Sequence, residues 1–466
     1  MTMKLTSARR LARFAFGTLV SGLGGCAANA DGTSLEGAEP SLAESDAALR
    51  CDSPSRELDP STKFFIAPPP AGAVKQVEKL LKSRKYADAA RITAMEATPQ
   101  AVWFEKGTPA EVKSAVKKTM AEAALTRRVP VLVSYNLPFR DCAQYSAGGA
   151  TDAAAYKAWI DGFAKGIGSG KAVVILEPDS LGIIPYNTTI FGAEDWCKPT
   201  VTDASGDTVP APGATSEERY ALLQYAVKTI LEKAPSASVF LDGTHSAWLG
   251  VSEAAYRLYK AGFKDGVQQV QGFFLNVSNY ESSSDNVQFG TWVSMCLAAG
   301  TPGVGPDWMR DATTGAPHFD WCPGQYDPAT NYTKVNYTPE FAAGITAGIE
   351  GLMGGASPQV KFVVDTSRNG VGSWSPAPEA AYPDAQTWCN PPHRGLGARP
   401  TANTGNALAS AYLWVKLPGA SDGSCNRGIA GSSTDPEWGG ITDPAAGAWF
   451  PEQALELARL ASPPLF

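Results

Sequence analysis

The chain has 466 residues, of which 44% are hydrophobic and 18% are charged, a composition that can bury a large core and argues against a mainly disordered chain. Its net charge of −7 and its lack of a basic tract argue against a nucleic-acid partner, because phosphate binding needs clustered lysine and arginine. Twelve tryptophans, fifteen tyrosines and 46 glycines indicate many loops and a surface lined with aromatic rings; such rings stack on bases or on sugars, and the acidic balance favours sugars.

Residues 1–26 are predicted to be a signal peptide. Basic residues come first: Lys4, Arg9, Arg10 and Arg13. An apolar stretch at 14–23 follows, which is too short to span a bilayer. Residues 23–26, Leu-Gly-Gly-Cys, resemble a bacterial lipobox, which would make Cys26 a lipid anchor; the alternative is ordinary cleavage near residues 28–30. Either process makes the mature protein extracytoplasmic, secreted or lipid-anchored at the cell surface, where disulfides persist.

Cysteine usage fits such a compartment. The eight cysteines are residues 26, 51, 142, 197, 296, 322, 389 and 425. Without Cys26 seven remain, so at least one lacks a partner inside the domain, and we expect it to be Cys51. There are only three histidines and no C-x-x-C pair, so we predict no metal site. Spacing alone does not fix the connectivity of loop disulfides; the pairing in chain order that we expect is Cys142–Cys197, Cys296–Cys322 and Cys389–Cys425.

Composition changes near residue 60. Residues 27–60 carry eight acids and two arginines among small residues, which predicts a disordered acidic tether. From there to residue 466, apolar strands alternate with amphipathic helices, without linker or internal repeat, which predicts one α/β domain at 61–466 with a parallel sheet. The predicted strands are 63–67, 91–95, 129–135, 172–177, 237–242, 270–276, 360–365 and 411–416.

Capping sequences mark two helix starts. Thr108 precedes Pro109 and Glu111, and Thr215 precedes Glu218; each set predicts an N-cap with a capping box. Segments rich in Gly, Pro, Ser, Asp and Trp are predicted to be long loops that wall a cleft. These loops are 182–214, 279–335 and 370–408.

Two neighbouring predicted strands end in carboxylates. The run at 129–135 leads to Asp141, and the run at 172–177 leads to Glu177 and Asp179. In an α/β sheet or barrel, groups just beyond the carboxyl ends of parallel strands face the ligand site. Two carboxyl groups over one cleft are the minimum equipment for acid-catalysed glycoside cleavage.

Seven stretches in chain order resemble the signatures of glycoside hydrolase family 6, the inverting β-1,4-glucanases. They are YNLPFRDC with AQYSAGG at 135–149, VILEPDSL at 174–181, LDGTHSAWLG at 241–250, FFLNVSNY at 273–280, FVVDTSRNG at 362–370, WCNPPHRGLGARP at 388–400 and WVKLPGASDG at 414–423. The resemblance covers residues 62–466. It implies an α/β fold, a distorted (β/α) barrel of the TIM type with seven or eight parallel strands and long cleft-forming loops, and it implies neither cofactor nor metal.

The resemblance makes Asp179 the general acid. A free aspartic acid titrates near about 3.9, so something must keep Asp179 protonated near neutral pH. Asp141 would do so by like-charge repulsion, could stabilise positive charge on the sugar ring, and would be balanced by Arg140. Glu177 is expected to be a structural acid rather than the proton donor.

Asp422 matches the candidate base of the family. An inverting enzyme needs room for a water, with carboxyl groups about 6.5–9.5 Å apart. The family usually has Glu where this chain has Ala420, which removes one acid from the far wall. The alternative to Asp422 as the base is a relay that deprotonates the water. In that case Ser146 would hold the water, although Ser146 is shifted by one residue from the family pattern.

The other site residues would contact the substrate. Tyr135 is expected to lie under the reactive sugar. The alternative is that it is a packed tyrosine at the end of a strand. Trp103, Trp248 and Trp388 match positions at which the family stacks glucose rings, although tryptophan is more often a core residue. Polar contacts are expected from His245, Asn276, Asp365, Arg368 and Lys416; taken singly, a histidine is more often structural and a lysine solvated. Asp242 is expected to be a buried structural partner.

We therefore predict a monomeric, secreted or surface-anchored hydrolase that cuts internal β-1,4-glucosidic bonds of cellulose or related glucans with inversion. One alternative is a cellobiohydrolase that acts from chain ends. The segments 368–388 and 422–449 look too short to roof a tunnel, which argues against this alternative. The insertion at 281–335 could add a wall, which argues for it. A glucan-binding surface protein that has lost activity is another, suggested by Ala420. A barrel isomerase would need a metal or a histidine base, which this sequence does not favour.

Overall fold

Seven parallel strands form the central sheet among the residues that the computed structural model describes, which are 56–142, 144–263, 270–326 and 335–466. The order is β1-β2-β3-β6-β7-β8-β9, with every neighbouring pair parallel. The strands are β1 (Val102–Phe104), β2 (Val131–Ser134), β3 (Ala172–Leu176), β6 (Ala237–Asp242), β7 (Gly272–Leu275), β8 (Lys361–Asp365) and β9 (Ala409–Leu413). This is the parallel α/β architecture that the alternation of strands and helices predicted.

The strands are buried on both faces, which explains why they read as continuous apolar runs. In β2 and β3 the side chains alternate between two cores. Leu132 and Val174 pack with residues of the covering helices, whereas Val133 and Val173 pack with other strand residues on the opposite face. The second core consists mainly of side chains from the strands and from residues close to the strand ends, so it fills the concave side of a curled sheet.

The curl brings the two edge strands together at their ends. The backbone N–H of Ala101, just before β1, donates to the carbonyl of Trp414, just after β9 (2.9 Å). The indole N–H of Trp103 donates to the carbonyl of Val415 (2.8 Å). The sheet is therefore a distorted barrel, in which side-chain and single backbone bonds take the place of a β1–β9 ladder.

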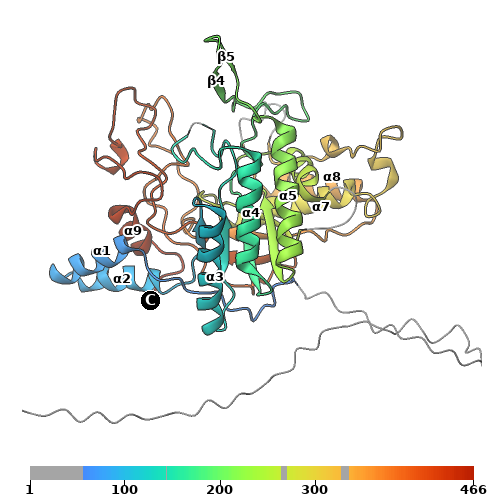
Figure 1. The fold of residues 1–466 in the computed structure, drawn as a ribbon. Coiled ribbons are helices and arrows are strands. Elements are labelled where there is room, and N and C mark those ends of the chain that lie inside the picture. The colour runs from blue at the N-terminus through green and yellow to red at the C-terminus, as the bar shows by residue number, and fades with distance from the viewer. Residues whose placement is uncertain (1–55, 143, 264–269, 327–334) are drawn as a thin grey trace, which may run out of the picture. The chain divides into compact units, whose positions relative to one another are not determined.

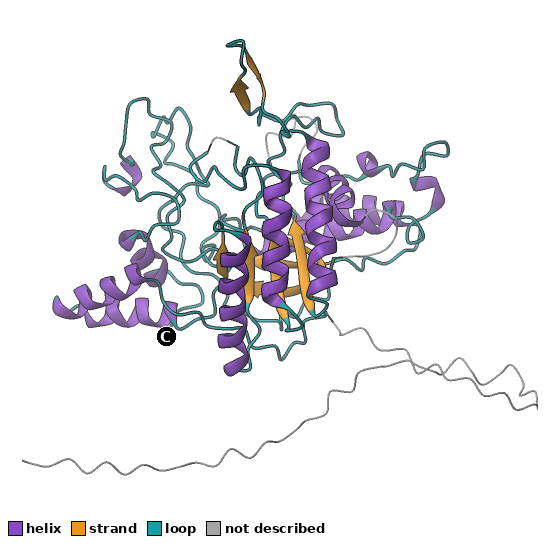
Figure 2. Ribbon diagram, in the orientation of Figure 1, coloured by secondary structure: helices purple, strands orange, loops and turns teal. Residues whose placement is uncertain are grey.

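Helices cover the convex face. The helices are α1 (Ala71–Lys82), α2 (Tyr86–Glu96), α3 (Pro109–Leu125), α4 (Ala153–Ile167), α5 (Ser216–Lys233), α6 (Val251–Leu258), α7 (Ser283–Gly300), α8 (Pro339–Met353) and α9 (Pro451–Arg459). Helices α3, α4 and α5 lie side by side in front of the strands (Figures 1 and 2). Helices α1, α2 and α9 share a separate small core. None of these described helices combines the length and the apolar character that crossing a membrane would require.

Both predicted helix starts are present. Thr108 and Glu111 form the complete capping box at the start of α3, with Pro109 in its first turn. At α5 the side chain of Thr215 accepts a hydrogen bond from the backbone N–H of Glu218. Together these caps fix where two of the covering helices begin.

Two predicted strands were wrong, and one strand of the central sheet was missed. Residues 91–95 belong to α2, because Ala89, Ile92 and Met95 are buried three residues apart, on one side of a helix. In 63–67 only Phe64 pairs, in a single bridge to Val129. The missed strand is β1, whose three residues are too few to show a period. The last predicted strand, 411–416, begins two residues earlier as β9.

The predicted loop at 279–335 is helical over 283–300, as α7. This helix is buried on nearly all sides, so its sequence lacks the apolar stripe that marks a surface helix. The loop at 182–214 contains an exposed hairpin, β4 (Thr200–Thr202) and β5 (Thr208–Pro210), while 370–408 has neither helix nor strand.

The three disulfides expected from chain order are confirmed: Cys142–Cys197, Cys296–Cys322 and Cys389–Cys425. The predicted signal peptide, Cys26, Cys51 and residues 27–55 of the predicted tether lie outside the described residues. In the remainder of that tether, the side chain of Arg56 donates to the carbonyl of Pro235 (3.0 Å). The side chain of Arg56 thus contacts the α/β domain from within the stretch that was predicted to be a tether.

Candidate active site

Residues with left-handed backbone gather where the strands end. The non-glycine residues with positive φ angles include Asp141 (56°), Glu177 (53°), Asp179 (63°), Asn276 (66°) and Ser278 (62°), which follow β2, β3 and β7. A non-glycine residue in this region costs roughly 1–3 kcal/mol and persists only where its surroundings fix it. The segments beyond the carboxyl ends of these strands therefore hold several strained residues, and they carry the predicted carboxylates.

Asp141 and Asp179 lie beside each other and line one narrow depression. Burial, followed by the charge of Asp141, raises the pKa of Asp179 well above its ordinary value, while Lys416 opposes the rise. Burial also raises the pKa of Asp141, although the hydroxyl of Tyr135, which donates a hydrogen bond to it, and the guanidinium of Arg140 act the other way. The hydroxyl and the cation favour charge on Asp141, so the proton of the pair belongs on Asp179.

A buried arginine on α5 joins the two loops that carry this pair. Arg219 donates to the carbonyls of Ser180 (3.2 Å) and Ile183 (3.1 Å), beyond β3. It also donates to the carbonyls of Pro138 (3.1 Å) and Phe139 (3.4 Å), beyond β2. These carbonyls have left the sheet and need other donors. Arg219 therefore fixes the two loops relative to each other.

Glu177 acts as a structural latch. Its carboxylate accepts hydrogen bonds from the backbone N–H groups of Asn136 (2.8 Å) and Leu137 (2.9 Å) and from the hydroxyls of Ser134 and Tyr156. This ties the end of β3 to the start of the loop that carries Asp141. With its oxygens engaged and the side chain buried, Glu177 is not placed to donate a proton to a ligand.

Asp242 is a second latch, at the end of β6. It accepts from the backbone N–H groups of Leu181 (3.0 Å), Gly182 (3.3 Å) and Thr244 (2.9 Å). Burial raises its pKa to about 6, against these hydrogen bonds. Its contacts hold the chain immediately after Asp179.

Asp422 is embedded among donors. Its Oδ2 accepts from the Tyr280 hydroxyl (2.6 Å), Arg368 Nη1 (3.0 Å) and the backbone N–H of Asn390 (3.0 Å). Its Oδ1 lies 3.1 Å from Lys416 Nζ. Burial opposes ionisation, but Arg368 and Lys416 outweigh it and lower the pKa of Asp422 to about 2. This carboxylate is therefore ionised, in contrast to Asp179.

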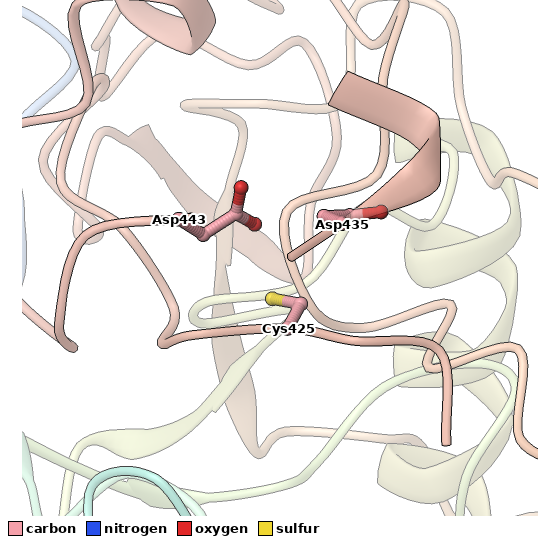
Figure 3. A group of neighbouring side chains, drawn as sticks. All are labelled: Cys425, Asp435 and Asp443. Carbon is pink, nitrogen blue, oxygen red and sulfur yellow. The ribbon is translucent and has the colours of Figure 1, made fainter. Parts of the chain in front are cut away.

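Asn390 holds Asp422 from behind. Its side-chain oxygen accepts from the backbone N–H of Asp422 (2.8 Å), and its Nδ2 donates to Asp443 (2.8 Å). Asp443 in turn lies close to Asp435 (Figure 3). Asp435 pairs with the buried Arg427. Burial, with a contribution from Asp435, raises the pKa of Asp443 to about 7. The orientation of Asp422 thus depends on a buried pair of carboxyl groups.

The same carboxyl pair and Cys425 have the spacing of a metal site, but not its chemistry. One ligand atom from each of Cys425, Asp435 and Asp443 lies within 4.8 Å of the others (Figure 3). A cysteine binds metal as a thiolate, whereas the Cys425 sulfur is bonded to Cys389. Asp435 is already neutralised by Arg427. The group therefore does not suit a metal ion.

A cleft of about 870 Å³ opens beside these carboxyls. Eight aromatic side chains line it: Trp103, Tyr135, Tyr145, Trp196, Trp248, Tyr280, Trp374 and Trp388. Its polar lining includes Ser146, His245, Lys416 and Asp422. Flat rings with a few polar groups between them suit ligands with apolar faces and polar edges, such as pyranose rings.

Asp141 and Asp179 lie next to this cleft rather than among the residues that line it. Arg140 lines both the cleft and the narrow depression of the two aspartates. Asp141 is buried, whereas Asp179 is partly exposed and lies in the electrostatic field of the cleft residues Lys416 and Asp422. Asp179 is therefore the one of the two that a ligand can reach.

His245 and Tyr135 meet the cleft in defined states. His245 Nδ1 accepts from the backbone N–H of Ala247 (3.2 Å), and burial lowers the pKa of His245 to about 3, so its ring is neutral. Its ring centroid lies 5.6 Å from that of Trp248. The Tyr135 ring contacts Trp103 edge-on (5.2 Å) and has Arg140 over its face (4.2 Å).

Three predicted contact residues lie outside the cleft. Asn276 is fully buried, and its amide bonds to Glu281 and to the carbonyl of Asp365. Asp365 accepts from the backbone N–H groups of Val415 and Lys416. Arg368 is buried against Asp422 and Tyr280. These residues shape the site from beneath, because they are buried and most of their polar atoms are engaged by protein partners.

Several functional residues escaped the sequence analysis. Tyr280 and Asn390 lie within quoted motifs, so the signal was present, but their hydrogen bonds to Asp422 join segments far apart in the chain. Arg219 lies in the first turn of a helix with a capping sequence, where it reads as a surface residue. Trp196 and Trp374 lie in the Gly- and Pro-rich loops, and only their composition marked them.

A curled parallel α/β sheet with two aspartates whose pKa values are shifted in opposite directions beside an aromatic cleft is typical of the glycoside hydrolase class. The family model of glycosyl hydrolases family 6 matches residues 60–461. The chain belongs to this family.

Named relatives fall into two kinds. Endoglucanase A of Cellulomonas fimi is 30% identical over 404 residues, which are 86% of this chain and 62% of that protein, so this chain spans less than two thirds of it. Endoglucanase 1 of Streptomyces halstedii is 31% identical over 408 residues, 87% of this chain and 92% of that protein. A 1,4-β-D-glucan cellobiohydrolase of Pyricularia oryzae is 26% identical over 401 residues, 81% of this chain and 67% of that protein. The relatives thus include both endoglucanases and a cellobiohydrolase.

A solved structure agrees with the fold. The endoglucanase Cel6 of Mycobacterium tuberculosis, in complex with methyl-cellobiosyl-4-deoxy-4-thio-β-D-cellobioside, superposes with a TM-score of 0.56 at 29% identity. The match covers 86% of this chain and 98% of that one.

The carboxyl pair behind Asn390 predicts a pH-dependent stability. The pKa of Asp443 is raised from 3.8 to about 7 in the folded chain, so between these values the folded chain binds more protons than the unfolded one. The contribution of Asp443 to stability therefore falls as pH rises through this window. Asp443→Asn mimics the protonated acid without titrating. We expect the free energy of unfolding of the variant, relative to the wild type, to increase from pH 4 to pH 7, by at most about 1.4 kcal/mol per pH unit.

Urea unfolding at several pH values measures this difference. Asp207→Asn, on an exposed residue of the β4–β5 hairpin, is the matched control and should follow the wild type. Parallel stability curves for the wild type and Asp443→Asn would contradict the expected titration.

Proposed function

We propose that this chain is an extracytoplasmic β-1,4-glucan hydrolase that cuts internal bonds of cellulose or related glucans with inversion. The observation on which this proposal rests is that the pKa values of two aspartates at one site are shifted in opposite directions. The pKa of Asp179 is raised, which favours keeping its proton, and that of Asp422 is lowered, which favours losing it. Carboxyl groups whose surroundings push their pKa values apart are the signature of an acid and its partner in glycoside cleavage. The endoglucanase relatives support the substrate and the internal mode.

In this proposal Asp179 protonates the glycosidic oxygen. Burial and Asp141 keep the proton on Asp179 until a sugar oxygen accepts it. Asp141, held by the Tyr135 hydroxyl, then faces the positive charge that develops on the sugar ring. Its negative charge lowers the cost of that state because the surroundings are poorly solvated.

The water attacks the anomeric carbon from the opposite face, and its proton passes to Asp422. A carboxylate with a pKa of about 2 is a weak proton acceptor, so this transfer belongs late in the reaction, when the water already carries positive charge. Lys416 and Arg368 fix the orientation of the Asp422 carboxylate, but their positive charges also make it a weaker base. The absence of a second acid at Ala420 leaves Asp422 as the ionised acid on this wall of the cleft.

The aromatic residues give the cleft its length. Trp103, Trp248 and Trp388 would each stack one glucose ring, and Trp196 and Trp374 extend the set. Cleavage occurs on the outside of the cell, which the disulfides Cys142–Cys197, Cys296–Cys322 and Cys389–Cys425 support. Secretion with or without a lipid on Cys26, and action as a monomer, belong to this proposal.

Action from chain ends is the second candidate, and one contact favours it. Tyr145, on the loop after β2, meets residues of the loop before β9: its ring centroid lies 6.0 Å from that of Trp388, and its hydroxyl accepts from Gln386 Nε2 (3.4 Å). Both loops line the cleft. If this bridge roofs the bound glucan, it confines the enzyme to chain ends.

The acid assignment predicts the effect of Asp179→Asn. The amide keeps the shape but has no proton to give, so we expect hydrolysis of cellohexaose to fall by a factor of about 10³ or more, while the dissociation constant for the oligosaccharide changes little. Asp207→Asn serves as the control for general effects of charge loss. Unchanged turnover in Asp179→Asn would refute the role, and a β-anomeric product in early NMR spectra of the wild type would refute inversion.

The pairing of Lys416 with Asp422 predicts a shift in the pH profile. Lys416 lies 3.1 Å from Asp422 and lowers its pKa, so Lys416→Met should raise that pKa and move the acid limb of kcat/KM to higher pH. Asp422→Asn should instead lower kcat by about 10² or more at every pH, because it removes the acceptor. Near-normal activity of Asp422→Asn would show that a water relay or another group takes the proton.

The Tyr145 bridge predicts how the two modes separate. Tyr145→Ala removes the ring that joins the two loops, while Tyr145→Phe keeps it. For an internal cutter, viscosity of a soluble cellulose derivative falls steeply before reducing ends accumulate, and all three forms should behave alike. Chain-end action would give a different result. The wild type and Tyr145→Phe would release reducing sugar with little loss of viscosity, whereas Tyr145→Ala would lower the viscosity.

A further inference from the structure

Two exposed tryptophans lie together on the segment that follows α7. Among the described residues, the exposed tryptophans are Trp196, Trp308 and Trp321. Trp196 lines the cleft. Trp308 and Trp321 are exposed to 50% and 47%, and their ring centroids lie 6.5 Å apart with planes 18° from parallel. Large apolar side chains that cluster at a surface mark a binding site more often than isolated ones do.

The backbone beneath these rings is anchored. Each tryptophan belongs to a short 3-10 helix, Asp307–Met309 or Phe319–Trp321, whose buried member is Met309 or Phe319. The backbone N–H of His318 donates to the carbonyl of Met309 (2.9 Å), which joins the two helices. The disulfide Cys296–Cys322 ties the second helix to α7. Rings presented from a fixed backbone lose little entropy when a ligand binds.

The surroundings of the rings are flat and polar. The His318 ring lies on Trp321 with a centroid distance of 4.1 Å and planes 3° from parallel. Asp320 approaches His318 to 3.7 Å, and Arg310 pairs with Asp307 at the base of Trp308. A pyranose in a β-linked glucan has C–H groups on its faces and hydroxyls at its edge, which match aromatic faces with polar groups around them.

This surface is separate from the cleft but belongs to a segment that supports it. Trp308, Trp321 and His318 do not line the cleft. The same segment continues to Gln325 and Tyr326, whose side chains donate to the carbonyls of Ser246, Leu249 and Trp248. The segment therefore carries the exposed rings of Trp308 and Trp321, and further along it supports the loop of Trp248 through hydrogen bonds from Gln325 and Tyr326.

We propose that Trp308 and Trp321, with His318, form a second carbohydrate-binding surface outside the cleft, which binds a chain of the β-glucan polymer on which the cleft acts. The identity of the sugar rests on the proposed function, while the existence of the surface rests on the rings themselves. Its role is to hold the polymer near the cleft, so it matters for long or insoluble glucans and not for short oligosaccharides.

The test compares Trp308→Ala/Trp321→Ala with the wild type on polymer and on oligosaccharide. In affinity electrophoresis through gels that contain hydroxyethylcellulose, we expect the dissociation constant to rise about tenfold, equivalent to about 1.4 kcal/mol. Hydrolysis of cellohexaose should stay within about twofold of the wild type. Tyr86→Ala/Leu125→Ala, which removes exposed apolar side chains elsewhere, is the matched control and should bind the polymer as the wild type does.

A conservative pair separates stacking from folding. Trp308→Phe/Trp321→Phe keeps flat rings and should retain most of the polymer affinity. Polymer binding that is unaffected by the alanine pair, or equally weak binding of the alanine and phenylalanine pairs, would overturn the proposal. A wild-type dimer in sedimentation that the alanine pair dissolves would also overturn it, because the occupant would then be a second copy of the chain.

Failure of the proposed function gives a different result. If the wild type cleaves no β-1,4-glucan but its retention by the polymer still depends on Trp308 and Trp321, the binding surface stands and the catalytic proposal falls. If cellohexaose is cleaved and the tryptophans do not affect retention, the reverse holds.

Discussion

The site depends on one buried guanidinium. Arg219 bonds to carbonyls on the loop beyond β2 and on the loop beyond β3, at the point where the chain leaves the sheet and its carbonyls lose their strand partners. A buried cation is costly, and burial lowers the pKa of Arg219 to about 10, but Glu177 and Asp141 nearby favour its charge. Because both loops share this donor, Asp141 and Asp179 keep their separation, and Asp141 can act on the proton of Asp179.

Charge compensation then divides the carboxyl groups into two kinds. On the β2–β3 side the cation is shared among loop carbonyls and several acids, so burial dominates and Asp179 favours its neutral form. On the β8–β9 side Arg368 and Lys416 both bond to Asp422, so that carboxyl is charged. The same residue type therefore holds a proton at one place and lacks it at the other, and the difference arises from the number of cations that each aspartate contacts.

The particular failures of the sequence analysis share a cause. Residues 91–95 are apolar enough for a strand, yet they are helical because α2 packs against α9, which lies at the far end of the chain. Asn276 and Arg368 stand in signature motifs, as a contact residue would, yet each has its polar atoms bound to residues distant in sequence. Conversely, Tyr280, Asn390 and Arg219 bond to Asp422 or to the loops of Asp141 and Asp179, which lie far from them in the sequence. A motif names the residues near a site, but not the direction in which each side chain points.

The sequence by itself determined the alternation of buried strands and helices, the helix starts at Thr108 and Thr215, the placement of aspartates beyond β2 and β3, and the family. These features follow from local rules: side-chain period, capping and the order of short motifs. Only the tertiary structure decided which neighbours shift the pKa values of Asp179 and Asp422 in opposite directions, which predicted residues reach the cleft, and that Trp308 and Trp321 meet at the surface. These depend on burial and on the charges that neighbours bring, and both are set by contacts between residues far apart in the chain.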